Sequence, residues 1–249
     1  MTAEAYDLQV GGEVTGRGRD EISAGWAGPR GPGIDLRTWP RSPRTGQPMM
    51  HCFTLWLPEQ YRRRGPDLHA VSVFQWNDEL YFKDPLPGLA QPVRHPQLQL
   101  ADDGVDHLFA MVWLTHDELN GDRTDRPAAA ADLADGERDI AAVMQRYGRF
   151  GGLWLLPRED PNAGVAPVAY PGDGDAYVDV PDLYDRFHDE HLGGTAMSAN
   201  GIRDGVSPWY LEVNRLGGLS HGGDEDLALD LEGEFLGGLS SHVRIAGTA

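Results

Sequence analysis

Two histidines, His188 and His191, have the spacing in this chain that most favours a metal site. They lie three positions apart in segment 181–192, whose apolar residues recur at helical spacing. On a helix this spacing points two imidazoles in one direction, so that with an outside carboxylate they could hold zinc or another divalent ion. In the competing interpretation His191 packs on the apolar face of the helix, near the negative end of its dipole. Because no H-E-x-x-H signature is present, we favour the packed histidine over a metal site.

Two acidic clusters supply the oxygen atoms that hard cations prefer. The first contains Asp173 and Asp175, and the second contains Asp224, Glu225 and Asp226. Neither cluster follows the residue spacing of a calcium-binding loop. We interpret both as solvated turns that form an acidic, partner-binding surface. Weak binding of a divalent cation stays open, and we expect no other cofactor.

Two further patterns contain nucleophilic residue types. The segment Gly218-Leu219-Ser220-His221-Gly222 matches the G-x-S-x-G elbow of hydrolases, which needs an acid and then a histidine later in the chain. Only 27 residues follow it, with His242 as the sole candidate base. Cys52 lies within an apolar run, where a thiol is buried and inert rather than activated. We therefore predict no catalytic residues.

Length and composition bound the class of protein. A chain of 249 residues with 40% hydrophobic residues and seven Trp can bury a sizeable core. Its longest apolar runs are shorter than the roughly 20 residues that a membrane helix needs. The N-terminal segment has no pattern of a secretion signal, and a single cysteine excludes an internal disulfide. We expect a cytoplasmic protein with no membrane partner.

Charge is distributed unevenly along the chain. Residues 1–100 contain 11 acidic and 11 basic side chains, whereas residues 101–249 contain 28 acidic and 10 basic ones. The second segment therefore carries the whole net charge of −18. Nucleic-acid binding depends on Lys and Arg at the phosphates, so this balance argues against a nucleic-acid partner. It favours cations, a basic protein partner or simple solubility.

The sequence predicts an α+β fold with many short antiparallel strands and a few helices. We expect a single globular domain, with two similar halves at about 1–120 and 135–249 joined by a polar, Ala-rich connection. Strands are expected at residues 6–14, 49–57, 69–76, 80–82, 105–114, 165–170, 176–180, 209–216, 227–231 and 242–245. Helices are expected at 57–65, from a capping box at Thr115, at 135–147 and at 181–192.

A hydrophobic residue followed by Gly-Gly occurs five times, at Val10, Phe150, Leu192, Leu216 and Leu236. The separations are irregular, which excludes a repeat protein of fixed period. Glycine pairs at element ends permit positive φ angles or a close approach of two backbones. A shared turn type in two similar halves would produce them.

A series of short motifs connects the first 85 residues to a known family. They are the segment from Ile34 to Arg41 with its Trp39-Pro40, then Gly46-Gln47-Pro48, the strand that ends at Leu57-Pro58, and Val71 to Gln75. Over about residues 25–85 the chain resembles the YwqG-like family of bacterial proteins of unknown function. The segment from Gly148 to Pro157 is similar to the Gly-Gly opening of that family. The resemblance implies an α+β fold built from two related halves and no established enzyme activity. Some such proteins belong to toxin-immunity or stress-related gene neighbourhoods.

These observations favour an acidic binding protein without catalytic activity, such as an immunity-type inhibitor of a basic toxin or effector. Two alternatives stay open. The chain could be a module of a larger assembly that packs on a sister chain, or a metal-assisted hydrolase that uses His188 and His191. The sequence makes no prediction of the oligomeric state.

Overall fold

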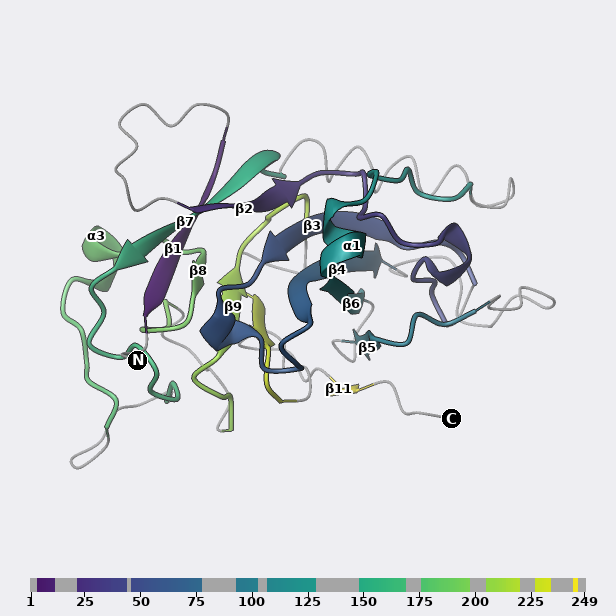
Figure 1. The fold of residues 1–249 in the computed structure, drawn as a ribbon. Coiled ribbons are helices and arrows are strands. Elements are labelled where there is room, and N and C mark those ends of the chain that lie inside the picture. Colours follow the sequence, from purple (N-terminus) through teal and green to yellow (C-terminus); the bar gives the residue numbers. More distant parts are fainter. Residues whose placement is uncertain are drawn as a thin grey trace.

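The computed structural model describes residues 4–11, 22–43, 46–77, 93–102, 107–128, 148–168, 176–197, 205–219, 227–233 and 244–245. In these residues the chain forms one curled antiparallel β-sheet, a half-barrel (Figure 1). The prediction of an α+β fold is therefore wrong, and the fold is essentially all-β. Its strands are β1 (Ala5–Val10), β2 (Ile22–Ala27), β3 (Met50–Trp56), β4 (Leu68–Asn77), β5 (Leu98–Asp102), β6 (His107–Thr115), β7 (Gly151–Arg158), β8 (His191–Leu192), β9 (Tyr210–Val213), β10 (Leu227–Asp230) and β11 (Arg244–Ile245).

Helices are short throughout the described residues. They are α1 (His116–Asn120), α3 (Leu183–Arg186) and the 3-10 helices η1 (Leu36–Thr38) and η2 (Glu59–Tyr61). Helix α1 begins at the predicted capping box, in which Thr115 and Glu118 satisfy each other's backbone N–H groups. The expected helix at 57–65 is reduced to η2. None of the described helices is long and apolar enough to cross a membrane.

The order of strands in the sheet is β10-β9-β8-β1-β7-β2-β3-β4-β6-β5-β11. Strand β7 lies between β1 and β2 and pairs antiparallel with both. Strands from both predicted halves therefore belong to one continuous sheet.

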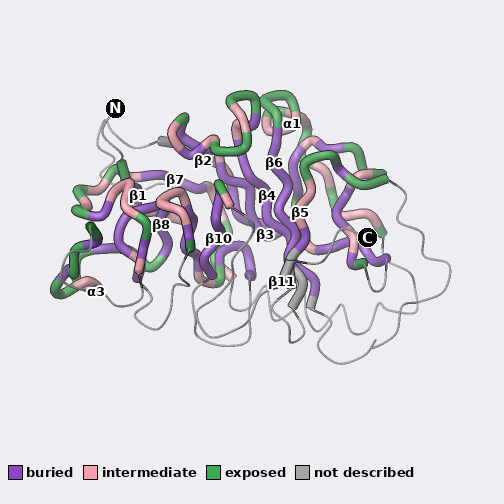
Figure 2. Tube along the Cα trace, turned by 90° about the horizontal axis from the view of Figure 1, so that it is seen from below, coloured by how far each residue is buried: buried purple, intermediate pink, exposed green. Residues whose placement is uncertain are grey.

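Apolar side chains pack on both faces of the central strands. In β4, Val71 and Val73 join a core that also contains Leu229 of β10, near the far end of the sheet. Strands so far apart in the sheet order can share a core only inside the curl. On the opposite face Ala70 and Phe74 belong to a second core with Ile34, Trp39 and Met49, against which Leu119 of α1 packs. The central strands are accordingly buried on both sides (Figure 2).

Two of three consecutive arginines, Arg63 and Arg64, connect the two sides of the curl. The guanidinium group of Arg64 donates to Gln99 of β5, at 3.0 Å, and to the carbonyl of Gly233, just after β10. Arg63 pairs with Glu232 at 2.5 Å. Each arginine also stacks on a tryptophan: Arg62 on Trp56 at 5.4 Å, Arg63 on Trp209 at 5.0 Å and Arg64 on Trp113 at 4.8 Å. We call Arg63 and Arg64 with these contacts the arginine clamp.

Most expected strands are confirmed and several elements are not. The strands expected at 6–14, 49–57, 69–76, 105–114, 209–216, 227–231 and 242–245 correspond to β1, β3, β4, β6, β9, β10 and β11. Residues 165–168 and 176–180 form no strand, and β2, β5, β7 and β8 were not predicted. The predicted strand at 80–82 and the helix at 135–147 lie outside the described residues.

Candidate interaction surface around helix α3

The structure separates the two histidines of the predicted metal site. The helix expected at 181–192 is wrong: α3 ends at Arg186, and His191 lies in strand β8. His191 is buried, with Nδ1 2.9 Å from the carbonyl of Gly193 and Nε2 2.7 Å from the carboxylate of Glu212. Both ring nitrogens are occupied, so neither is available to a metal. His188 is exposed, and its Nε2 lies 3.3 Å from Nε2 of Gln9.

The described residues contain no group of three or more His, Cys, Asp or Glu side chains placed to hold a metal ion. The acidic residues predicted to bind a partner, Asp173, Asp175, Asp224, Glu225 and Asp226, lie outside the described residues, as does Ser220. Cys52 is buried as predicted, and burial raises the pKa of its thiol.

Arg158, at the end of β7, organises the polar contacts beneath α3. Its guanidinium group pairs with Asp7 at 2.9 Å and with Asp160 at 2.7 Å. It also donates to the backbone carbonyls of Gly193 and Thr195. The ring of Phe187, directly after α3, packs on the guanidinium plane at 4.2 Å. One buried cation thus joins β1, β7, α3 and the turn after β8.

Asp160 is the fully buried carboxylate of this network. Burial by itself raises the pKa of Asp160, but hydrogen bonds from the backbone N–H and hydroxyl of Thr195, at 2.8 and 2.7 Å, and the charge of Arg158 outweigh it. The pKa of Asp160 is therefore lowered, and the carboxylate stays ionised.

Segment 176–180 is held by hydrogen bonds from side chains and not by pairing with a neighbouring strand. The amide group of Asn162 accepts from the backbone N–H of Val178 at 2.7 Å and donates to the carbonyl of Val178 at 2.8 Å. The hydroxyl of Tyr177 accepts from the N–H of Ala196 at 2.9 Å, and burial raises the pKa of Tyr177 to about 12. The segment is therefore fixed without β-pairing.

Four exposed aspartates lie on this anchored framework. They are Asp179, Asp182, Asp185 and Asp189, which we call the acidic rim. Within the described part of the chain none of them forms an ion pair. Val178, beside the rim, is 50% exposed and adds an apolar contact surface.

A hollow of about 520 Å³ opens beside the rim. It is lined by Glu4, Arg158, Glu159, Asp160, Pro161, Ala163 and Arg186. Glu4 is held in place because the hydroxyl of Tyr6 donates to its carboxylate at 2.5 Å and that of Tyr61 donates to its carbonyl at 2.7 Å. The lining contains no hydroxyl, thiol or imidazole that could act as a nucleophile or base. Its exposed carboxylates, Glu4 and Glu159, suit the recognition of a cationic side chain.

Sequence reasoning missed a buried cluster of hydroxyls around an imidazole. His51 Nε2 lies 2.9 Å from the hydroxyl of Thr54 and 3.1 Å from that of Ser72, and Nδ1 contacts the carbonyl of Gly28. Such pairs occur in nucleophilic catalysis. Here Ser72 and Thr54 are fully buried in the sheet, which excludes a substrate. Burial lowers the pKa of His51 to about 4, and the cluster is structural.

Comparisons of the chain with protein-family models, curated proteins and solved structures give no match. The resemblance to the YwqG-like family therefore stays a prediction. Arg158 was also missed from the sequence. The available signal was a single cation two residues after the apolar segment Leu153 to Leu156, because a cation buried at the end of such a strand needs paired carboxylates.

Proposed function

We propose that this chain is a binding protein without catalytic activity whose acidic rim takes a basic protein partner, in the manner of an immunity-type inhibitor. The observation that carries the proposal is a set of four exposed carboxylates without ion pairs in the described structure, on a framework held by buried hydrogen bonds. The cationic side chains of the partner would supply the missing counter-charges.

Two physical effects support this function. Fixed binding groups lose little conformational entropy on association, and the contacts of Phe187 and Asn162 fix the backbone on both sides of the rim. An anionic surface also accelerates the encounter with a cationic partner and disfavours anionic ones. The net charge of −18 extends this attraction beyond the rim itself.

The resemblance to the YwqG-like family is compatible with this proposal, since it implies no established enzyme activity. We propose that the chain binds its partner in the cytoplasm, where a single buried thiol such as Cys52 stays reduced. The alternative of a module that packs on a sister chain stays a prediction. The hydrolase alternative draws no support from His191, whose ring nitrogens are both engaged.

Affinity capture from a lysate of the source organism, at low salt, tests the proposal. One variant replaces Asp179, Asp182, Asp185 and Asp189 with Asn. A matched control neutralises the exposed Glu59, Asp67, Asp117 and Asp122 on other elements, with the same change in net charge. We expect the wild-type chain and the control to retain the same basic protein and the rim variant to lose it.

If the rim variant still retains that protein, the acidic rim is not the surface that binds the partner. Capture of no stoichiometric partner at low salt, where attraction between opposite charges is strongest, would contradict the function itself.

A further inference from the structure

A row of cationic and aromatic side chains lies away from α3, at one end of three neighbouring strands. Trp56 is the last residue of β3, His69 is the second residue of β4, and His116 directly follows β6. The register pairs Trp56 with Ala70 and Leu68 with Thr115, so the three side chains belong to adjacent positions across the sheet. The rings of His69 and His116 meet edge to face at 5.7 Å.

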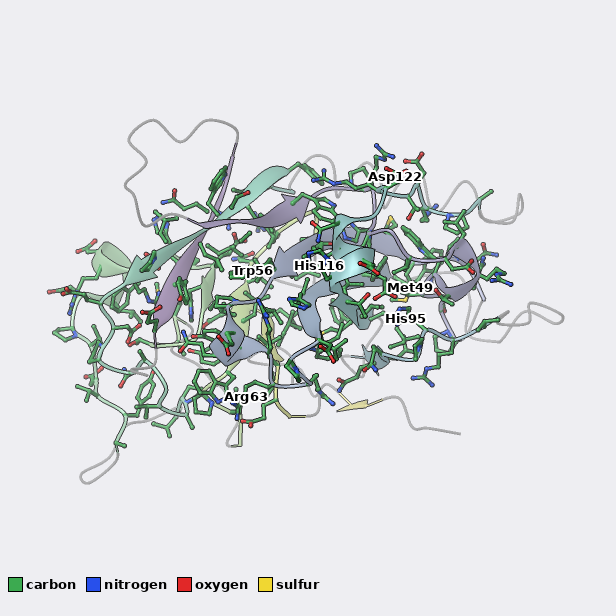
Figure 3. All side chains as sticks on the ribbon, viewed as in Figure 1. Met49, Trp56, Arg63, His95, His116 and Asp122 are labelled. Carbon is green, nitrogen blue, oxygen red and sulfur yellow. The ribbon has the colours of Figure 1, made fainter. Side chains whose placement is uncertain are left out.

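Arg62 completes this row with an oriented guanidinium group. The group stacks on Trp56 at 5.4 Å, and its Nε donates to the carbonyl of Leu57 at 3.0 Å. Leu57 in turn donates its N–H to the carbonyl of His69 at 2.8 Å. Unlike Arg63 and Arg64, whose outer nitrogens serve the arginine clamp, Arg62 has two terminal nitrogens with no partner among the described residues. Figure 3 labels Trp56 and His116 of this row.

Arg62 brings a positive charge close to the imidazole of His69. The pKa of His69 is lowered, first by burial and then by the charges of Arg62 and His116, which outweigh the opposite effect of Asp67. His116 also lies 3.6 Å from Asp117, but both side chains are exposed, so water weakens that pair. Arg62 is thus the fixed positive charge of this row, and the imidazole of His69 beside it is held in its neutral form.

We propose that Arg62, His69 and His116 form a binding site for a phosphate-type oxyanion. The two free Nη groups of Arg62 present a planar fork that matches two phosphate oxygens. The imidazoles of His69 and His116 offer further N–H donors on the same side of the sheet. The ligand is either free phosphate or a phosphorylated side chain of another protein, which present the same oxygens. This site is separate from the acidic rim, and the two proposals stand or fall independently.

The test is a titration of the full chain with inorganic phosphate, followed by the NMR signals of the histidine rings at constant pH and ionic strength. We expect saturable shifts of the His69 and His116 signals, assigned with His69→Gln and His116→Gln. Arg62→Gln should weaken phosphate binding by about tenfold or more, because it removes a charge-assisted hydrogen-bond pair. Arg94→Gln, at an exposed arginine elsewhere, is the matched control and should bind phosphate as the wild type does.

Unfolding curves show whether Arg62→Gln remains folded. If it does not, Arg62→Lys replaces it in the titration, since lysine keeps the positive charge but lacks the two Nη groups of the guanidinium. A parallel titration with a phosphoserine peptide identifies the source. Tighter binding than that of phosphate assigns a phosphorylated partner, and equal binding assigns the free ion. Shifts that do not saturate, or equal shifts in the wild type and the folded Arg62 variant, would overturn the proposal.

Discussion

Burial of His51 couples the stability of this fold to pH. The folded pKa of about 4 lies below the ordinary value of 6.5, so the unfolded chain takes up the proton first as pH falls. The stability due to neutral His51 is complete above about pH 6.5 and disappears progressively down to about pH 4. A shift of this size corresponds to about 3 kcal/mol in the free energy of unfolding.

Urea unfolding of the wild type and His51→Asn between pH 7 and pH 4 measures this effect. The wild type should lose about 3 kcal/mol more than the variant over this range, because the carboxylates are common to both proteins. Parallel pH profiles would show that His51 is not buried in its neutral form.

Arg158 is the residue on which the framework of the acidic rim depends most. Arg158→Met keeps an unbranched apolar stem but leaves the carboxylates of Asp7 and Asp160 without their cation. Loss of one partner of a buried ion pair typically costs about 3–5 kcal/mol, and we expect a destabilisation of that order in chemical unfolding.

The double variant Arg158→Met with Asp160→Asn serves as the control, since it removes the buried charge as well as its partner. It should recover part of the lost stability. A cost below about 1 kcal/mol for the single variant would contradict the assigned network.

At the scale of elements, the two Leu-Gly-Gly turns that lie within the described residues carry a backbone that only glycine adopts readily. The φ angles are +65° and +84° at Gly193 and Gly194, and +62° and +84° at Gly217 and Gly218. A Cβ atom on Gly217 would lie 1.8 Å from the carbonyl oxygen of Cys52 in β3. The turn after β9 therefore packs directly on the central sheet.

Gly217→Ala should destabilise the fold by about 2 kcal/mol or more. The alanine places a Cβ atom on a backbone in the left-handed conformation, and that atom forces β3 to shift. Gly152→Ala is the control, since its Cβ would find its nearest atom at 3.6 Å, an ordinary contact. Thermal unfolding of both variants measures the difference. Equal stability would contradict the close approach.

The same scale explains which elements could be predicted from the sequence. Strands β3, β4 and β6 are rich in apolar, aromatic and β-branched residues, and they were predicted because their own residues suffice for a buried strand. Strand β2 contains Gly25, which is needed because the carbonyl of Thr54 packs where a Cβ atom would lie. In the sequence alone, a glycine at this place indicates a turn rather than a strand. Helix 181–192 was predicted from apolar spacing, yet Phe187 packs on Arg158 and His191 pairs with β1. Contacts with distant strands determine the conformation of that segment, and the spacing of its apolar residues does not predict those contacts.

The candidate site was less predictable than the fold. The uneven charge of the chain indicated an acidic surface after residue 101, but the five residues chosen for it lie outside the described residues. The acidic rim was not chosen, because its aspartates are spread over residues 179–189 rather than clustered. The row of Arg62, His69 and His116 comes from three separate segments, and only the strand register brings them together.

At the scale of the whole molecule, the arginine clamp joins two parts of the sheet that are distant in its strand order. Arg64→Ala removes the link between β5 and the turn after β10, together with the stacking on Trp113. Hydrogen exchange should become faster in β5 and β10, with a loss of stability on the order of 1 kcal/mol. Arg37→Ala, whose described side-chain contacts are confined to Asp35, is the control and should leave both strands protected. Unchanged exchange in the Arg64 variant would show that the sheet closes without the clamp.

The central claim is that the carboxylates around α3 hold a basic partner. It is tested most directly by the association rate constant between the chain and the captured protein, measured from low to high ionic strength. The wild-type rate should fall steeply as salt rises, whereas the variant with Asn at residues 179, 182, 185 and 189 should bind slowly at low salt with a much flatter dependence. An equal rate and salt dependence for the wild type and that variant would contradict the claim.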